Sequence, residues 1–458
     1  MKKIKTVIRA LAFVVAFAVL FGAVSNVLVC PNDKRIYQWV PQFYENEKNS
    51  LDAVYIGSST AYAFWSPALA WKKDGIAVWN YTSPRQPLDA AKYIIEDCRK
   101  TQKDALYIVN INRVDSSLSK TALHYLLDYM PFSLTKLKLT HSLCEKMGLS
   151  LEKRVQYYFP LELYHSRWSE LSAADFSYKA DGTMGSAKYY SFLNKSLNVG
   201  ELGTLGDGES ESAADENEET VQSGGLGVLG ELLDYCEENG VKVLFTINPQ
   251  LEKAAERRAG LEKAKQLITE RGFEYVDFWE NSEDTGIEIP QDFYNDLHTN
   301  IHGAIKMTNV LSDYLVEHYS FENKQGKSGY EDWDKSVEIY GDVIAPYVLP
   351  FETETKNRDY SLSAPVLTKS VFDSSKVILE WNKAENAEGY EIFRKTSDGK
   401  TAFTKIAELG ADALSFDDST VQTGSGITYN YVIVAFRTED TAKVYGKFNY
   451  NGVNVTVK

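Results

Sequence analysis

The alternation of short apolar runs with amphipathic helical stretches between residues 51 and 278 most constrains the fold of this chain. Five runs have the length of strands, at residues 53–57, 76–81, 105–111, 241–247 and 274–278. Helical patterns lie between or after them, at residues 88–100, 227–240 and 251–272. This alternation is typical of a parallel sheet with helices on both faces. We therefore predict an α/β domain with a five-stranded parallel sheet.

The third and fourth runs are separated by more residues than a simple crossover needs. The insertion, residues 113–225, is rich in aromatic residues (VQYYFPLELYHSRW), and we predict that it is helical. Within it, His165 and Arg167 are candidates for contacts with an anionic substrate, although packing against the core is the simpler interpretation. Its end, residues 200–225, is acidic and glycine-rich, which predicts a disordered loop because such a segment buries too little apolar surface. Calcium binding is the less favoured alternative, since the acidic residues lack a regular ligand spacing.

The pattern changes after a polar, irregular segment at residues 319–360, within which we place a linker at 341–361 that packs against the first domain. Short alternating runs follow at residues 376–382, 389–395, 403–409, 428–436 and 445–457. The turns between them contain Asp-Gly and Gly-Ser-Gly. These features predict a small antiparallel sandwich over residues 362–458.

The N-terminus carries four basic residues, Lys2, Lys3, Lys5 and Arg9, before an uncharged run at 10–29. That run is about long enough to cross a bilayer, and the positive charge predicts that the rest of the chain lies outside the cytoplasm. A cleaved signal peptide is the alternative, with small residues at 22–25 as the cleavage site. Because the apolar run continues past them, we favour an uncleaved single-pass anchor at 1–30, in a bacterial cell membrane.

Composition excludes some partners. The net charge of −15 argues against nucleic acid, because an acidic protein cannot neutralise phosphates. After Cys30 only Cys98, Cys144 and Cys236 remain, too few and too scattered for a disulfide framework. We predict that these three are buried thiols.

The first strand ends in Gly57-Ser58-Ser59-Thr60, and a helical pattern follows. A parallel α/β sheet has its active site at the C-terminal ends of its strands. A serine there can act as a nucleophile, with the free amides of the helix holding an oxyanion. Serine at a helix start is more often only a cap, so this stretch alone favours a cap.

A serine nucleophile needs a base, and the stretch DFYNDLHTNIHG contains His298 and His302. Their spacing of four also suggests a metal pair, but no third ligand has a suitable spacing, so we predict no metal. Asp292, Asn295 and Asp296 are near enough in sequence to orient a histidine ring.

These stretches resemble the SGNH (GDSL-like) hydrolases over residues 51–319, and in particular their membrane-anchored bacterial branch, which includes the D-alanyl transfer protein of teichoic acid synthesis. Gly57-Ser58-Ser59 is similar to the block whose third residue is the nucleophile, which implies that Ser59 is catalytic. His298-Thr299-Asn300 resembles the block that holds the base, which implies His298 rather than His302. The resemblance implies a flavodoxin-like three-layer α/β/α domain over residues 31–340.

The resemblance also implies residues that bind the oxyanion or the substrate. Asn80 and Gln86 resemble the second block, in which Thr82 or Arg85 stands where a glycine is expected. Asn110 and Asn112 lie near the third block, and either matches its asparagine.

The block around the base differs from the family pattern at one position. Asn295 occupies the position where the family has an aspartate, so Asp292 or Asp296 is the candidate for supplying the charge beside His298.

The implied activity is that of a serine esterase or O-acyltransferase acting on acylated cell-envelope glycopolymers, without a cofactor. Envelope-assembly proteins are possible partners. The main alternative is a binding or scaffolding protein with the same fold whose chemistry has decayed, as Asn295 suggests. The C-terminal unit resembles a fibronectin type III domain, with core aromatics at Trp381, Tyr390, Tyr429 and Tyr431. Exposed aromatics there would instead favour a sugar-binding adhesin.

Overall fold

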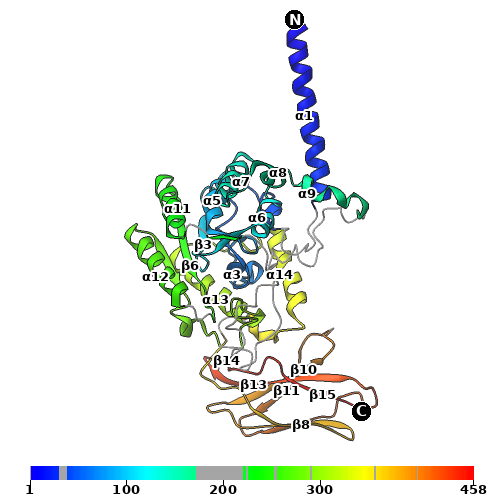
Figure 1. The fold of residues 1–458 in the computed structure, drawn as a ribbon. Coiled ribbons are helices and arrows are strands. Elements are labelled where there is room, and N and C mark those ends of the chain that lie inside the picture. Colours follow the sequence, from blue (N-terminus) through cyan, green and yellow to red (C-terminus); the bar gives the residue numbers. More distant parts are fainter. Residues whose placement is uncertain are drawn as a thin grey trace.

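The computed structural model describes residues 2–29, 39–171, 220–222, 225–251, 255–288, 291–354, 357–399 and 401–458. It has three parts: a protruding helix α1 (Lys2–Leu28), an α/β domain, and a β-sandwich at the end opposite α1 (Figure 1). Within α1, residues Ile4–Ser25 have a mean hydropathy of 2.5. By length and composition this helix qualifies as a membrane span or a signal sequence.

The centre of the α/β domain is a parallel sheet with the strand order β2-β1-β3-β6-β7. The strands are β1 (Ala53–Gly57), β2 (Val78–Thr82), β3 (Leu106–Asn110), β6 (Val243–Ile247) and β7 (Glu274–Asp277). Every residue of the first four is buried, as expected for parallel strands covered on both faces. The predicted five-stranded parallel sheet is therefore confirmed.

Helices cover both faces of this sheet. On one face, Ile56 and Val109 share a core with α5 (Ala91–Cys98), α11 (Leu226–Glu238) and α12 (Ala255–Glu270). On the other face, Tyr55 and Ile108 pack with α4 (Pro67–Asp74) and α13 (Ile301–His318). Shorter elements complete the domain: α2 (Trp39–Phe43), α3 (Ser59–Tyr62), η1 (Leu88–Ala90) and η6 (Ser282–Thr285).

The insertion after β3 is mainly helical where it is described. Its elements are α6 (Lys120–Leu127), α7 (Leu134–Lys146), α8 (Leu151–Tyr158), α9 (Leu161–Tyr164) and η2 (His165–Ser169). A short antiparallel pair, β4 (Ser117–Ser119) with β5 (Thr220–Gln222), was not predicted. The acidic segment 200–225 lies outside the described residues, except for 220–222 and 225.

The segment expected to be irregular contains a packed helix, α14 (Glu331–Ile344), followed by η7 (Pro350–Thr353). Trp333 of α14 lies against Trp71 of α4, with ring centroids 5.3 Å apart. The apolar residues Trp333, Tyr340 and Ile344 are buried on one face of α14. Acidic residues stand between them in the sequence, so the helical pattern was not recognised.

The C-terminal domain consists of two antiparallel sheets. One contains β8 (Leu367–Asp373), β9 (Lys376–Trp381) and β12 (Ser415–Asp418); the other contains β10 (Gly389–Thr396), β11 (Thr404–Gly410), β13 (Thr428–Glu439), β14 (Ala442–Tyr445) and β15 (Val453–Thr456). The four aromatics predicted to be core residues are all buried. The prediction of one strand at 445–457 is wrong. Residues 446–452 leave the sheet and contact the α/β domain, where Gln291 donates to the Phe448 carbonyl.

The thiols of Cys98, Cys144 and Cys236 are buried and free, as predicted. Burial raises the pKa of Cys144 to about 11 and that of Cys236 to about 12, so both thiols stay protonated near neutral pH.

Candidate active site

The candidate site lies at the C-terminal edge of the parallel sheet, where β1 and β3 end side by side. In a sheet with this strand order, β1 and β3 flank the point at which the chain reverses direction, which is the usual place for a ligand site. Gly57 allows the close approach of these elements. A Cβ atom at this position would lie 2.9 Å from the Cβ atoms of both Ala61 and Asn110.

The two serines after β1 have different surroundings. Ser58 is buried and caps α3: its Oγ accepts a hydrogen bond from the backbone N–H of Thr60 (3.4 Å) and also bonds the Thr60 hydroxyl (2.9 Å). Ser59, the first residue of α3, is half-buried, and its hydroxyl makes no hydrogen bond to any described residue. The capping role therefore falls to Ser58, and the Ser59 hydroxyl stays uncommitted.

A buried network of amides ties the ends of β1, β3 and β6 together. Asn110 Oδ1 accepts from the Thr60 hydroxyl (2.8 Å), and Asn110 Nδ2 donates to Asn112 Oδ1 (2.7 Å) and to the Thr246 carbonyl (3.3 Å). The structure thus brings the predicted pair Asn110 and Asn112 together, and the side-chain amide of Asn110 donates to Asn112 and Thr246.

Sequence analysis missed Asn248, which completes this network. Its Nδ2 donates to the Thr60 carbonyl (2.7 Å) and to the Tyr55 hydroxyl (3.1 Å), while its backbone N–H and carbonyl bond the side chain of Asn112 (2.7 Å each). Asn248 therefore fixes the start of α3. The available signal was its position directly after a buried strand.

The loop after β2 forms the other side of a small hollow lined by Gly57, Ser58, Gln86, Asn110 and Arg113. Gln86 is buried and accepts a hydrogen bond from the Ser83 hydroxyl (3.1 Å). Asn80 is also buried, within β2 and opposite Tyr55 of β1.

Arg85, at one of the positions where a glycine was expected, has a φ of 54°. This left-handed conformation is the one that glycine favours. Of the two candidate positions, Thr82 and Arg85, it is therefore Arg85 that has the backbone conformation expected of a glycine.

The candidate base lies on a tight hairpin, residues 292–300. Phe293 and Thr299 form an antiparallel bridge, and the side chain of Asn300 caps α13 by accepting from the N–H groups of His302 (3.0 Å) and Gly303 (3.1 Å). Within the hairpin, Asn295 Oδ1 lies 2.9 Å from His298 Nδ1 and also accepts from the His298 backbone N–H (2.9 Å). Asn295 therefore contacts the imidazole directly.

Two contacts join this hairpin to the elements around Ser59. The Thr299 hydroxyl donates to the carbonyl of Ala63, the C-cap residue that follows α3 (2.5 Å). The backbone N–H of Leu251, in the loop after β6, donates to the Asp296 carbonyl (2.8 Å). Ser59 and His298 share no hydrogen bond within the described residues; such contacts are often loose before substrate binds.

Asp292 lies at the base of the hairpin and has a different set of partners. Its fully buried carboxylate accepts from Lys306 Nζ (2.7 Å), from the backbone N–H of Glu288 (2.6 Å) and from the Tyr450 hydroxyl of the sandwich (2.9 Å). The structure therefore brings Asn295, and not Asp292, to the imidazole of His298.

His302 belongs to the interface between the two domains. Its Nδ1 lies 2.5 Å from Glu352 Oε1, and its ring stacks on Tyr450 with centroids 3.7 Å apart. Elsewhere in the described residues, one group of acidic side chains has a spacing that suits a cation, Glu262, Asp277 and Glu280, but the ammonium of Lys265 lies among them.

The aromatic insertion places its polar candidates beside α1. Arg167 donates to the carbonyl of Leu28 at the end of α1, and His165 Nδ1 lies 2.7 Å from the Glu162 carbonyl.

Comparison with known proteins gives only partial matches. No model of a known protein family matches the chain. An amylopullulanase of Thermoanaerobacterium thermosulfurigenes is 35% identical over 126 residues, which is 27% of this chain and 6% of the relative. An amylopullulanase of Thermoanaerobacterium saccharolyticum is 31% identical over 135 residues, or 29% of this chain and 9% of the relative. The chain thus spans less than a tenth of the length of these relatives.

Solved structures match about a fifth of the chain. A fibronectin type III-like protein of Clostridium thermocellum is 24% identical, with 21% of this chain and 92% of that chain covered, at a TM-score of 0.16. A domain of that type from human collagen XX is 21% identical, covering 22% and 96%, at a TM-score of 0.16. Pectate lyase PelI of Erwinia chrysanthemi is 24% identical, covering 20% and 28%, at a TM-score of 0.16. TM-scores this low support no conclusion about activity.

Proposed function

We propose that the chain is a membrane-anchored SGNH-type serine esterase or O-acyltransferase that acts on acylated cell-envelope glycopolymers. The observation that carries the proposal is the different surroundings of the two serines. Ser58 caps α3, whereas the Ser59 hydroxyl, at the C-terminal edge of the sheet, makes no hydrogen bond to any residue that the structure describes. The contact between Asn295 and His298 on the neighbouring hairpin supports the choice of base.

In the proposed reaction, Ser59 Oγ attacks the acyl carbonyl and His298 Nε2 takes its proton. Because Asn295 Oδ1 accepts only, its contact with Nδ1 favours the tautomer protonated at Nδ1, which leaves Nε2 as the base. The backbone N–H of Ser59 is a donor for the oxyanion. His298 then returns the proton to the leaving group, and water or a sugar hydroxyl takes the acyl group from Ser59.

A second candidate is a binding or scaffolding protein with the same fold. The amide of Asn295 offers no negative charge to an imidazolium, and both amide hydrogens of Asn110 are bonded to Asn112 and Thr246. Both features weaken catalysis relative to a site with a carboxylate and a free asparagine donor.

The rest of the chain is consistent with a role at the cell surface. We propose that α1 is an uncleaved anchor and that the C-terminal domain is of the fibronectin type III class. Its predicted core aromatics are buried, which disfavours a sugar-binding adhesin built on those side chains.

The test is ester turnover by the full-length chain in detergent, with p-nitrophenyl acetate and with an acylated teichoic acid. We expect Ser59→Ala and His298→Ala each to lower kcat at least ~10³-fold. Ser58→Ala is the matched control: it should lose about 1 kcal/mol of stability with the cap but keep its activity.

Two results would count against the proposal. If Ser58→Ala is inactive and Ser59→Ala is active, the nucleophile is misassigned. If the wild-type chain turns over neither ester yet retains the polymer in a sedimentation assay, the binding protein becomes the better description.

A further inference from the structure

An exposed apolar strip runs along the insertion from α8 to η2. Leu151 and Val155 are four residues apart on one face of α8, and Phe159 directly follows the last residue of that helix. Their exposed fractions are 82%, 41% and 51%. Leu163 and Trp168 continue the strip through α9 and η2, at 43% and 72% exposure. Soluble proteins rarely expose a continuous strip of large apolar side chains without a partner.

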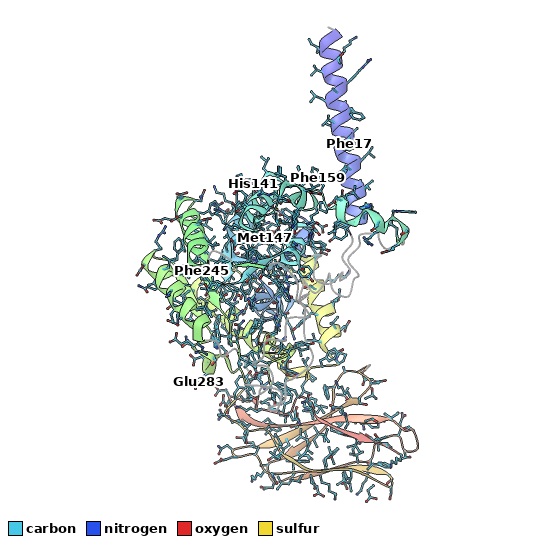
Figure 2. The ribbon with its side chains drawn as sticks, viewed as in Figure 1. Phe17, His141, Met147, Phe159, Phe245 and Glu283 are labelled. Carbon is cyan, nitrogen blue, oxygen red and sulfur yellow. The ribbon has the colours of Figure 1, made fainter. Side chains whose placement is uncertain are left out.

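The strip lies at the foot of α1, and direct contacts connect the two. The ring of Phe159 meets that of Phe21 edge to face, with centroids 5.8 Å apart. Phe21 continues a column of stacked rings along α1 through Phe17 and Phe13. Figure 2 shows Phe159 beside the domain end of α1 and Phe17 farther along the helix, away from the domain.

The length of α1 sets the depth at which the strip lies. The candidate span Ile4–Ser25 has 22 residues, about 33 Å of helix, and the uncharged run at 10–29 is about 30 Å long, so either matches a hydrocarbon core of about 30 Å. The core therefore ends between Ser25 and Val29. Leu28, whose carbonyl receives the Arg167 guanidinium, then lies at the boundary between the core and the headgroups, and Phe21 lies inside the core.

We propose that the apolar strip at residues 151–168 lies in the headgroup layer of the same bilayer that α1 spans, so that the α/β domain rests on the membrane surface. The inference depends on α1 being a membrane span, and it does not depend on the proposed catalysis. Tryptophan and phenylalanine are the residues that favour this layer. The sandwich, at the opposite end of the molecule, then faces away from the bilayer (Figure 1).

The test uses the full-length chain in vesicles of phosphatidylcholine and phosphatidylglycerol, with a fluorophore on one introduced cysteine. The label sites are Trp168→Cys in the strip, Leu11→Cys in α1, and Val366→Cys, a 61% exposed apolar site on the sandwich, as the control. The background carries Cys30→Ser. The other native cysteines, Cys98, Cys144 and Cys236, are buried, so they should not compete for the label. Each label is exposed in turn to nitroxide lipids and to aqueous iodide.

We expect lipid nitroxides to quench the Trp168 label at least about twofold more than the Val366 label, with iodide showing the reverse order. Quenching of the Trp168 label by iodide alone, while the Leu11 label responds to lipid, would overturn the proposal and leave the anchor intact. Protection of the Trp168 label from both quenchers would mean that protein, a second copy or a partner, covers the strip. Iodide quenching at Leu11 would remove the membrane span on which the proposal rests.

Discussion

The hydroxyl of Tyr450, in the sandwich, donates to the carboxylate of Asp292, in the α/β domain, over 2.9 Å. Burial and the charge of Asp292 raise the pKa of Tyr450 well above its usual value, so the hydroxyl remains a donor. Asp292 opens the hairpin that carries His298, and its backbone carbonyl accepts from the N–H of Asn300 at the other end of that hairpin (2.9 Å). The sandwich thus holds the hairpin of the candidate site at its base.

Tyr450→Phe removes this hydroxyl but keeps the ring that stacks on His302. We expect the free energy of unfolding to fall by about 1–3 kcal/mol, because a buried carboxylate loses one donor. Amide hydrogen exchange in residues 292–300 should also become faster. Tyr429→Phe is the control: among the described residues its hydroxyl accepts one long hydrogen bond, from the Gln422 N–H (3.5 Å), and we expect a change within about 0.5 kcal/mol. Equal losses in both variants would contradict a special role for Tyr450.

Asn295→Asp places a carboxylate where an amide now contacts His298. The new group keeps the acceptor for Nδ1 and adds negative charge, so we expect kcat for ester hydrolysis to rise about tenfold or more. The charge also stabilises the imidazolium, so the acidic limb of the pH–rate profile should move to higher pH. Asn295→Ala should instead lower kcat. An unchanged pH profile in Asn295→Asp would show that the His298 ring is not held by this residue.

Lys136 should make stability depend on pH. Its ammonium is buried in α7 and donates to the Met130 carbonyl (2.8 Å), and burial lowers its pKa to about 8. Above pH 8 the folded chain releases this proton while the unfolded chain keeps it until about pH 10.5, so the unfolded state binds more protons and stability rises with pH. Between pH 7 and 10, the free energy of unfolding of wild type should rise by up to about 3 kcal/mol relative to that of Lys136→Met.

The control for this measurement is Lys138→Met on the same helix. A hydrogen bond to Glu96 raises the pKa of Lys138. Its contribution to the stability of the folded chain is therefore fully present below about pH 10.5 and should not change between pH 7 and 10. Chemical denaturation at several pH values gives both differences. If the stability of wild type falls relative to that of Lys136→Met over this range, the pKa of Lys136 is not lowered in the folded chain.

Gly303 lets the hairpin pack closely on the start of α13. A Cβ atom there would overlap the Asp292 carbonyl oxygen and lie 2.8 Å from Thr299 Cγ2. We expect Gly303→Ala to destabilise the chain by about 1–3 kcal/mol, because the overlap involves backbone that cannot rotate away. In Gly341→Ala, within α14, the added methyl meets nothing within 4 Å, and helix propensity should add up to about 1 kcal/mol. Thermal unfolding of the pair separates the steric effect from the propensity effect.

Elements defined by local pattern could be predicted from the sequence. Buried parallel strands are nearly uninterrupted apolar runs, so the strand at Ala53–Gly57 was found with its exact bounds. The strand after Ile76 begins two residues later than expected, because apolar character continues into the preceding turn. Helix α14 was missed because acidic residues separate its apolar positions.

Contacts between distant segments could not be predicted. Asn248 meets Thr60 only because the chain order places β6 beside β3 and β3 beside β1. Tyr450 and Asp292 are 158 residues apart, and Tyr450 lies in a run that reads as strand. The ring of Tyr450 stacks on His302 of the other domain. Contacts of this kind depend on how the two domains pack together, and the periodicity of the local sequence does not predict that packing.

The three buried thiols have a consequence for how the folded chain responds to oxidants. In the extracytoplasmic location proposed for it, oxidants act on thiolates. Cys144 and Cys236, whose pKa values burial raises to about 11 and about 12, present almost none. No disulfide joins any of the described cysteines. In that proposed location the described thiols of the folded chain therefore react slowly with external oxidants.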